Sequence, residues 1–129
     1  MVIMKGKDEN ILVVKSKGFA VRIIRMYQWI RENKNEYLLC KQCLRSGTSI
    51  GANIREAIAA PSKADFMAKL NISLKEANET QYWLELFHET DYIDNTMFES
   101  MNKDIVELLK LLTSILKSTR KNMENKEQL

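Results

Sequence analysis

The chain has few of the residues that turns and catalytic sites need: its 129 residues include one proline, four glycines, two cysteines and one histidine. So little proline and glycine argues against a fold of many short strands, because each strand would need a turn at its end. One histidine and two cysteines leave few groups for acid–base or nucleophilic catalysis. These scarcities predict a helical protein that is not an enzyme.

Long apolar runs are also missing. The first residues, MVIMKGKDENILVVKSKG, contain only a four-residue apolar run at 11–14, whereas a secretory signal needs about 7–15 apolar residues. No stretch approaches the ~20 apolar residues of a membrane-spanning helix. We therefore expect a cytoplasmic protein that does not contact a membrane.

Charge of one sign is not in large excess, since the sequence contains 20 Lys and Arg residues and 17 Asp and Glu residues, which gives a net charge of +3. That excess is small for a protein dedicated to nucleic acid, so the distribution of charge matters more than its total. A length of 129 residues with 45% hydrophobic residues fits one compact core. We expect a single domain over residues 1–129.

Apolar residues recur at three- and four-residue steps in four segments, as in Phe19, Ile23, Met26 and Ile30. This periodicity predicts helices at about 17–33, 37–59, 62–90 and 96–120, with a frayed segment after them. Long amphipathic helices with short connections pack against their sequence neighbours. The predicted fold is therefore all-α, an elongated, antiparallel up-down-up-down four-helix bundle.

Local signals support these boundaries. Pro61 followed by Ser62, with Asp65 three residues later, indicates a helix stop and then a new N-cap. Thr96 and Glu99 repeat the capping spacing at the start of the last helix.

The predicted second helix carries small residues on its inward face. Gly47 and Gly51 each cost about 1 kcal/mol of helix propensity relative to Ala, so we expect them to let a neighbouring helix approach closely. Cys40 and Cys43 lie on the same face. With no second cysteine pair and no nearby histidine they cannot complete a zinc site, and we expect them to pack in the core.

The predicted third helix is apolar on two sides. One side faces the core, and the other is a candidate subunit interface formed by Ile72, Glu76, Glu79, Trp83 and Leu86. The alternative is a lone exposed tryptophan on a monomer, since scattered apolar residues are normal on protein surfaces.

Basic residues concentrate in the first third of the chain, where residues 1–34 hold eight basic and three acidic side chains. Arg22, Arg25 and Trp29 form one stripe, and the candidate nucleic-acid-binding residues are Lys15, Lys17, Arg22, Arg25, Lys41 and Arg45. Three interpretations remain open. The stripe is a solvated face, a phosphate-binding surface with an aromatic for base stacking, or a partner for the acidic third helix of a neighbouring subunit.

One pair of residues has the spacing of a metal site. Glu85 and His88 form a Glu-x-x-His pair, but di-iron bundles need two such pairs and glutamates from two further helices. We expect no catalytic residue, no bound metal and no cofactor. A metal-dependent oxidoreductase built on Glu85 and His88 remains an alternative.

Three segments resemble a known family: Leu44–Ala57 (LRSGTSIGANIREA), Ser62–Phe66 (SKADF) and Leu70–Leu86 (LNISLKEANETQYWLEL). The chain resembles the bacterial four helix bundle protein family over about 10–122. That family includes the proteins encoded in intervening sequences of 23S rRNA genes and is related to the accessory variability determinant of diversity-generating retroelements. The matching residues are structural: Gly47, Gly51, Asn53, Glu76 and Glu79.

The resemblance implies a cytoplasmic bacterial protein of unknown function that forms a homopentameric ring. For the retroelement relative it also implies nucleic-acid binding and a reverse transcriptase partner. We therefore expect a non-enzymatic homo-oligomeric scaffold that contacts RNA or DNA. The alternative is an adaptor, without nucleic acid, for a protein encoded nearby.

Overall fold

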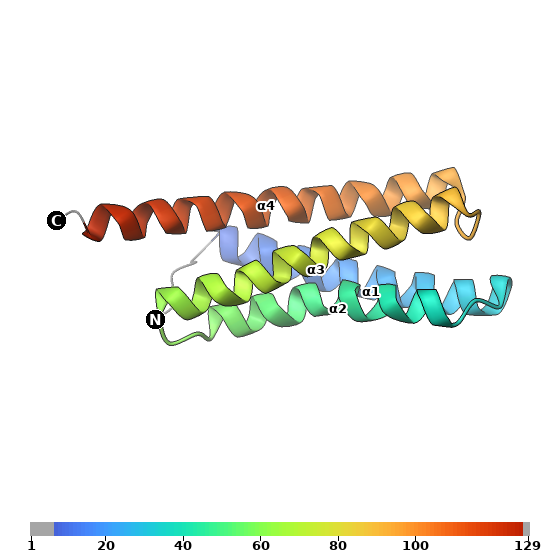
Figure 1. The fold of residues 1–129 in the computed structure, drawn as a ribbon, viewed down its shortest axis with the longest axis horizontal. Helices are drawn as coiled ribbons and strands as arrows, with labels where there is room; N and C mark the ends of the chain where they lie inside the picture. The colour runs from blue at the N-terminus through green and yellow to red at the C-terminus, as the bar shows by residue number, and fades with distance from the viewer. Residues whose placement is uncertain (1–6, 128–129) are drawn as a thin grey trace.

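The computed structural model describes residues 7–127 and consists of four helices joined by short connections. The helices are α1 (Lys7–Lys34), α2 (Leu38–Ile58), α3 (Lys63–Glu89) and α4 (Asn95–Glu127). In Figure 1 they lie along one long axis, and the connections alternate between the two ends of the molecule. The prediction of an all-α, four-helix arrangement is confirmed.

Two of the helices differ in length from the prediction. α1 begins at Lys7 rather than near residue 17, because its apolar stripe continues toward the N-terminus through the fully buried Leu12. α4 continues to Glu127 rather than ending near 120, since Leu116 and Thr119 are still buried close to that point. The segment predicted to fray is thus helical as far as Glu127.

The core is built from one face of every helix. The predicted stripe of Phe19, Ile23, Met26 and Ile30 is buried, and the side chains of Phe66 and Phe87 are fully buried opposite it on α3. Burial of such apolar area provides most of the stability of helices that are marginal on their own.

Side chains cap the beginnings of three helices. At α3, Ser62 Oγ accepts a hydrogen bond from the Asp65 N–H at 3.1 Å, as predicted. At α4 the cap is Asp94, whose carboxylate accepts from the Met97 N–H at 2.8 Å, rather than the predicted pair of Thr96 and Glu99. Asp94 has the required position because it lies one residue before the helix begins.

The beginning of α2 is capped by the carboxylate of Glu36, which accepts from the N–H groups of Leu39 at 3.0 Å and Cys40 at 2.8 Å. Partial burial alone would raise the pKa of Glu36, but these two donors, together with the Cys40 thiol and the Leu38 N–H, outweigh it and hold the pKa below its usual value. The cap therefore holds an ionised carboxylate at the positive end of the α2 dipole.

The two glycines of α2 face α1. A Cβ added at Gly47 would lie 2.8 Å from the side chain of Ile23, and one at Gly51 would lie 3.3 Å from Ser16 Oγ. The expectation that these glycines permit close helix approach is confirmed at Gly47, where the missing Cβ leaves room for Ile23.

Packing is uneven around the bundle. α2 contacts α1 on one side and α3 on the other, and α4 packs on α3, but α1 and α4 have the sparsest contact of any neighbouring pair. The side of the bundle between α1 and α4 is therefore its most open side.

Candidate functional site

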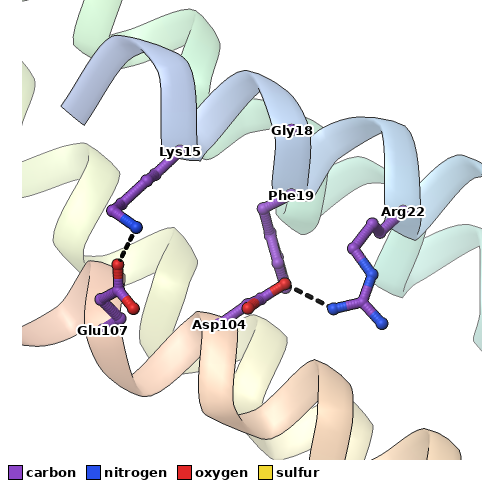
Figure 2. Close-up of a pocket in the computed structure, with 6 residues that line it drawn as sticks. All are labelled: Lys15, Gly18, Phe19, Arg22, Asp104 and Glu107. Carbon is purple, nitrogen blue, oxygen red and sulfur yellow. Dashed lines mark hydrogen bonds and ion pairs between the residues drawn. The ribbon is translucent and has the colours of Figure 1, made fainter. Parts of the chain in front are cut away.

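Two adjoining pockets lie between α1 and α4. The first, the ion-pair pocket, has a volume of about 230 Å³ and is lined by Lys15, Gly18, Phe19, Arg22, Asp104 and Glu107. Figure 2 shows Lys15 and Arg22 reaching across from α1 to the carboxylates of Glu107 and Asp104 on α4. Gly18 contributes no side chain, and a Cβ added there would meet nothing within 4 Å. Long charged side chains thus bridge the two helices without filling the space between them.

The second, the Trp29 pocket, shares Arg22 with the first. Its volume is about 290 Å³, and it is lined by Arg22, Arg25, Met26, Trp29, Met97 and Met101. Met26 and Met101 are buried and belong to the core, whereas the Trp29 side chain is 37% exposed. The pocket therefore combines apolar residues with arginine side chains.

Three of the six candidate nucleic-acid-binding residues are neutralised within the chain. Lys15 pairs with Glu107, Arg22 with Asp104, and Arg45 with Glu76 and Glu79. Arg22 also donates to Ser100, to the backbone oxygen at 3.3 Å and to Oγ at 2.6 Å. The other three candidates, Lys17, Arg25 and Lys41, are exposed, and within the part of the chain that the structure describes they form no ion pair.

Arg45 joins α2 to α3, at 3.2 Å from Glu76 and 2.6 Å from Glu79. Desolvation alone would lower the pKa of Arg45, but the two carboxylates outweigh it and raise the pKa above its usual value. Glu76 and Glu79 of α3 thus pair with a basic residue of the same chain. They do not need the basic stripe of a neighbouring subunit for compensation.

The predicted subunit interface is partly occupied by contacts within the chain. Trp83 is half-buried, its Nε1–H donates to Glu79 at 3.2 Å, and its ring stacks on Phe87 at 6.3 Å between centroids. Leu86 is half-buried, and Ile72 is 41% exposed. Ile72 is therefore the residue of the predicted set that leaves most apolar surface open to another molecule.

The Glu85 and His88 pair does not belong to a larger ligand cluster. His88 stacks on Phe98, with the ring centroids 4.3 Å apart, and its Nε2 contacts Asn95, so it joins α3 to the start of α4. Glu85 is exposed. Among residues 11–125, whose side chains the structure describes, no three His, Cys, Asp or Glu side chains lie close enough together to hold a metal ion.

Both cysteines are buried, as expected for core packing. Burial, assisted by the neighbouring Glu36, raises the pKa of Cys40 to about 11, and burial raises the pKa of Cys43 to about 12. At neutral pH both thiols remain protonated, and the thiolate form that nucleophilic chemistry needs is scarce.

Sequence reasoning missed one cationic surface, on the outward face of α4. We call it the lysine stripe, and it consists of the exposed residues Lys103, Lys110, Lys117 and Lys121. The acidic residues within this stretch, Asp104 and Glu107, pair with Arg22 and Lys15 of α1. Glu107 also lines a pocket that contains Lys103 and Lys110. In the described part of the chain no carboxylate pairs with the stripe. The seven-residue spacing of Lys103, Lys110 and Lys117, with Lys121 four residues further on, was a signal available in the sequence, because residues four or seven apart lie on one helix face.

Comparison with known proteins places this geometry in a family. A family model described as 23S rRNA-intervening sequence protein matches residues 8–114. The chain belongs to this family. The resemblance inferred from the motifs of α2 and α3 is thereby confirmed.

A solved structure agrees with the family and with the fold. It is the crystal structure of a protein with unknown function from the S23 ribosomal protein family of Bacteroides thetaiotaomicron VPI-5482, to which the chain is similar with 55% identity and a TM-score of 0.84. The match covers 85% of this chain and 98% of that chain. No curated protein matches the sequence.

None of the helices between residues 7 and 127 combines the length and the apolar character needed to cross a membrane. This finding agrees with the absence of long apolar runs from the sequence.

Proposed function

We propose that this member of the family is a non-enzymatic, self-associating scaffold that binds RNA through its exposed cationic side chains. The observation that carries the proposal is the lysine stripe of α4, four exposed lysines on one helix face without a carboxylate partner in the described residues. Lysines that neutralise phosphates release counterions, and this release drives binding.

The choice of RNA rests on the names of the relatives. The family is described by the intervening sequence of 23S rRNA, and the similar protein of known structure is assigned to a ribosomal protein family. Ribosomal RNA is therefore the first partner to test, with DNA of the same sequence as a comparison.

A matched pair of double variants tests the lysine stripe. Lys110→Gln with Lys117→Gln removes two charges from the stripe, and Lys34→Gln with Lys75→Gln removes two exposed charges from other helices. Fluorescence anisotropy with a labelled 23S rRNA fragment, repeated at several salt concentrations, gives the affinity and its salt slope. We expect the stripe variant to reduce the slope by about 1 for each phosphate that is no longer neutralised, and the control to change it little.

Two results would contradict the proposal. One is no binding of any RNA at low salt, which would instead favour the adaptor hypothesis. The other is an equal loss in both double variants, which would show that the total charge matters and the stripe does not.

Self-association is supported by apolar side chains that remain open on one chain. Val14 is 68% exposed, Val21 42% and Ile24 40% on α1, and Leu38 is 78% exposed at the start of α2. Contact with another subunit would remove these apolar side chains from water. The homopentameric ring implied by the family resemblance is a specific form of this proposal.

Light scattering at micromolar concentration tests self-association directly. A multiple of 15.0 kDa is expected, and a mass equal to one chain would overturn this half of the proposal. Val21→Glu and Ile72→Glu compare the two candidate faces, because each places a charge on one of them. The variant that lowers the mass identifies the face that the subunits use.

A further inference from the structure

The two tryptophans of the chain have different surroundings. Trp83 donates a hydrogen bond to Glu79 and stacks on Phe87 within the bundle. Trp29 is 37% exposed, and among the side chains of residues 11–125 no aromatic ring stacks on it and no acceptor takes its Nε1–H. Its indole ring is therefore partly open to a ligand.

The pocket beside Trp29 is suited to a flat, apolar group. Two buried methionines, Met26 and Met101, line it, Met97 adds a third side chain, and the volume is about 290 Å³. Methionine is flexible and polarisable and makes favourable contacts with aromatic rings, so these walls can adapt to a planar ligand.

The charged residues that line the pocket are both cationic. Arg22 is held in place by Asp104 and Ser100 and contributes a fixed guanidinium, already neutralised. Arg25 is exposed and makes no ion pair in the described part of the chain. No acidic side chain lines the pocket. A ligand that combines an aromatic ring with a negative charge complements this arrangement.

We propose that the Trp29 pocket binds an unpaired base of single-stranded RNA, with the base stacked on Trp29 and the adjacent phosphate held by Arg25. This inference rests on the proposed function and assigns a ligand class to one part of the surface. Aromatic stacking of this kind is tolerant of sequence, because every base has a π-face.

The proposal separates two kinds of contact on one molecule. A base within a duplex is stacked on both sides and paired at its edge, so it cannot enter a pocket between two helices without being extruded. Phosphates are accessible in both duplex and single strand, so the lysine stripe binds either. The Trp29 pocket therefore gives the protein a preference for unpaired segments.

Fluorescence of Trp29 measures occupancy of the pocket. In a Trp83→Phe background, with excitation at a wavelength that tyrosine does not absorb, the emission comes from Trp29 alone, since the chain contains two tryptophans. Single-stranded oligouridylate is expected to quench this emission in a saturable way, and a blunt RNA duplex of the same length is expected to leave it nearly unchanged.

Binding of labelled RNA by Trp29 variants tests the role of the ring. Trp29→Ala is expected to weaken binding of single-stranded RNA by about 5- to 150-fold while leaving duplex binding unchanged. Trp29→Phe is expected to keep most of the affinity, because it retains an aromatic face. Helical content by circular dichroism confirms that each variant folds.

The outcomes distinguish this inference from the proposed function. Equal binding of single strand and duplex, unaffected by Trp29→Ala, would overturn the pocket assignment and leave RNA binding standing. No binding of either RNA would overturn both. Quenching of Trp29 by an acidic amphipathic peptide, with none by RNA, would assign the pocket to a protein partner.

Discussion

The seam between α2 and α3 and the seam between α1 and α4 are built in opposite ways. Between α2 and α3 the inner contacts are short and buried: Thr80 Oγ1 donates to Ser46 Oγ at 2.8 Å, and Ser73 Oγ donates to the backbone oxygen of Ile50 at 2.9 Å. The ion pairs of Arg45 and Lys69 lie at the exposed edges of this seam. Between α1 and α4 the contacts are ion pairs of partly exposed side chains, with two pockets beside them.

The difference follows from side-chain length. Serine, threonine and alanine are small and let two helices approach closely. The hydroxyls of serine and threonine form hydrogen bonds across the short gap, so no buried polar group is left without a partner. Lysine and arginine span a wider separation and keep their charged ends near water. The short side chains thus give rigidity to the α2–α3 seam, while the long ones leave the α1–α4 seam open for a ligand.

The largest difference is expected from truncating one apolar residue at each seam. Ile50→Ala removes a fully buried side chain of α2 and should lower the free energy of unfolding by about 2–5 kcal/mol. Met97→Ala removes a half-buried side chain beside the Trp29 pocket and should lower it by about 1 kcal/mol. Urea denaturation of both variants measures the difference, and equal losses would contradict the contrast.

Glycine-to-alanine substitutions should change stability in opposite directions. Gly47→Ala places a Cβ 2.8 Å from Ile23, and overpacking of about 1–3 kcal/mol outweighs the gain in helix propensity of about 1 kcal/mol. Gly18→Ala meets nothing within 4 Å, so it should stabilise the protein by about 0.5–1 kcal/mol. Thermal melts of the two variants give the signs, and stabilisation by Gly47→Ala would show that α1 and α2 approach less closely.

A buried hydroxyl of the α2–α3 seam should contribute a smaller but measurable amount. Ser73→Ala removes the donor to the Ile50 carbonyl, which keeps its acceptor role within α2, so a loss of about 1 kcal/mol is expected. Ser114→Ala, at an exposed position of α4, serves as the control and should change stability by less than about 0.5 kcal/mol. A similar effect of both variants in urea denaturation would show that the buried hydrogen bond between Ser73 and Ile50 adds nothing measurable to stability.

The smallest effect is expected from the ion pairs of the α1–α4 seam. Asp104→Asn breaks the pair with Arg22, whose side chain is 38% exposed, and should cost no more than about 1 kcal/mol at low salt. The cost should shrink in about 0.5 M salt because screening already weakens the pair. A loss well above about 2 kcal/mol that persists at high salt would show that this seam is held as firmly as the other.

Periodicity and capping signals located α2 and α3 closely, because their apolar stripes and the Pro61-Ser62 break are local features. The same approach started α1 too late, because three of the four apolar residues at 11–14 are β-branched and do not favour a helix on their own; the burial of Leu12 places that residue on the core side of α1. Asp94 was missed as a cap because Thr96 and Glu99 offered the same spacing nearby.

The candidate site was less predictable than the fold. The α1 stripe of Arg22, Arg25 and Trp29 lies beside an open pocket, as an outward-facing stripe would. Which cations are free depends on contacts between residues distant in the chain, such as Arg45 with Glu76, and no local pattern reveals such a pair. For the same reason the lysine stripe could be recognised only in the structure, which shows that Asp104 and Glu107 pair with residues of α1 and not with these lysines.

The sequence alone determined the helical class, the four segments, the inward apolar faces and the family, because each depends on local periodicity or on a contiguous motif. The tertiary structure decided which charged side chains form ion pairs and which face solvent. It also decided which of the two tryptophans has a hydrogen-bond acceptor within the chain, and which pair of helices has pockets between them. These properties depend on distances between helices, and those distances are set by the size of the side chains that meet when the chain folds.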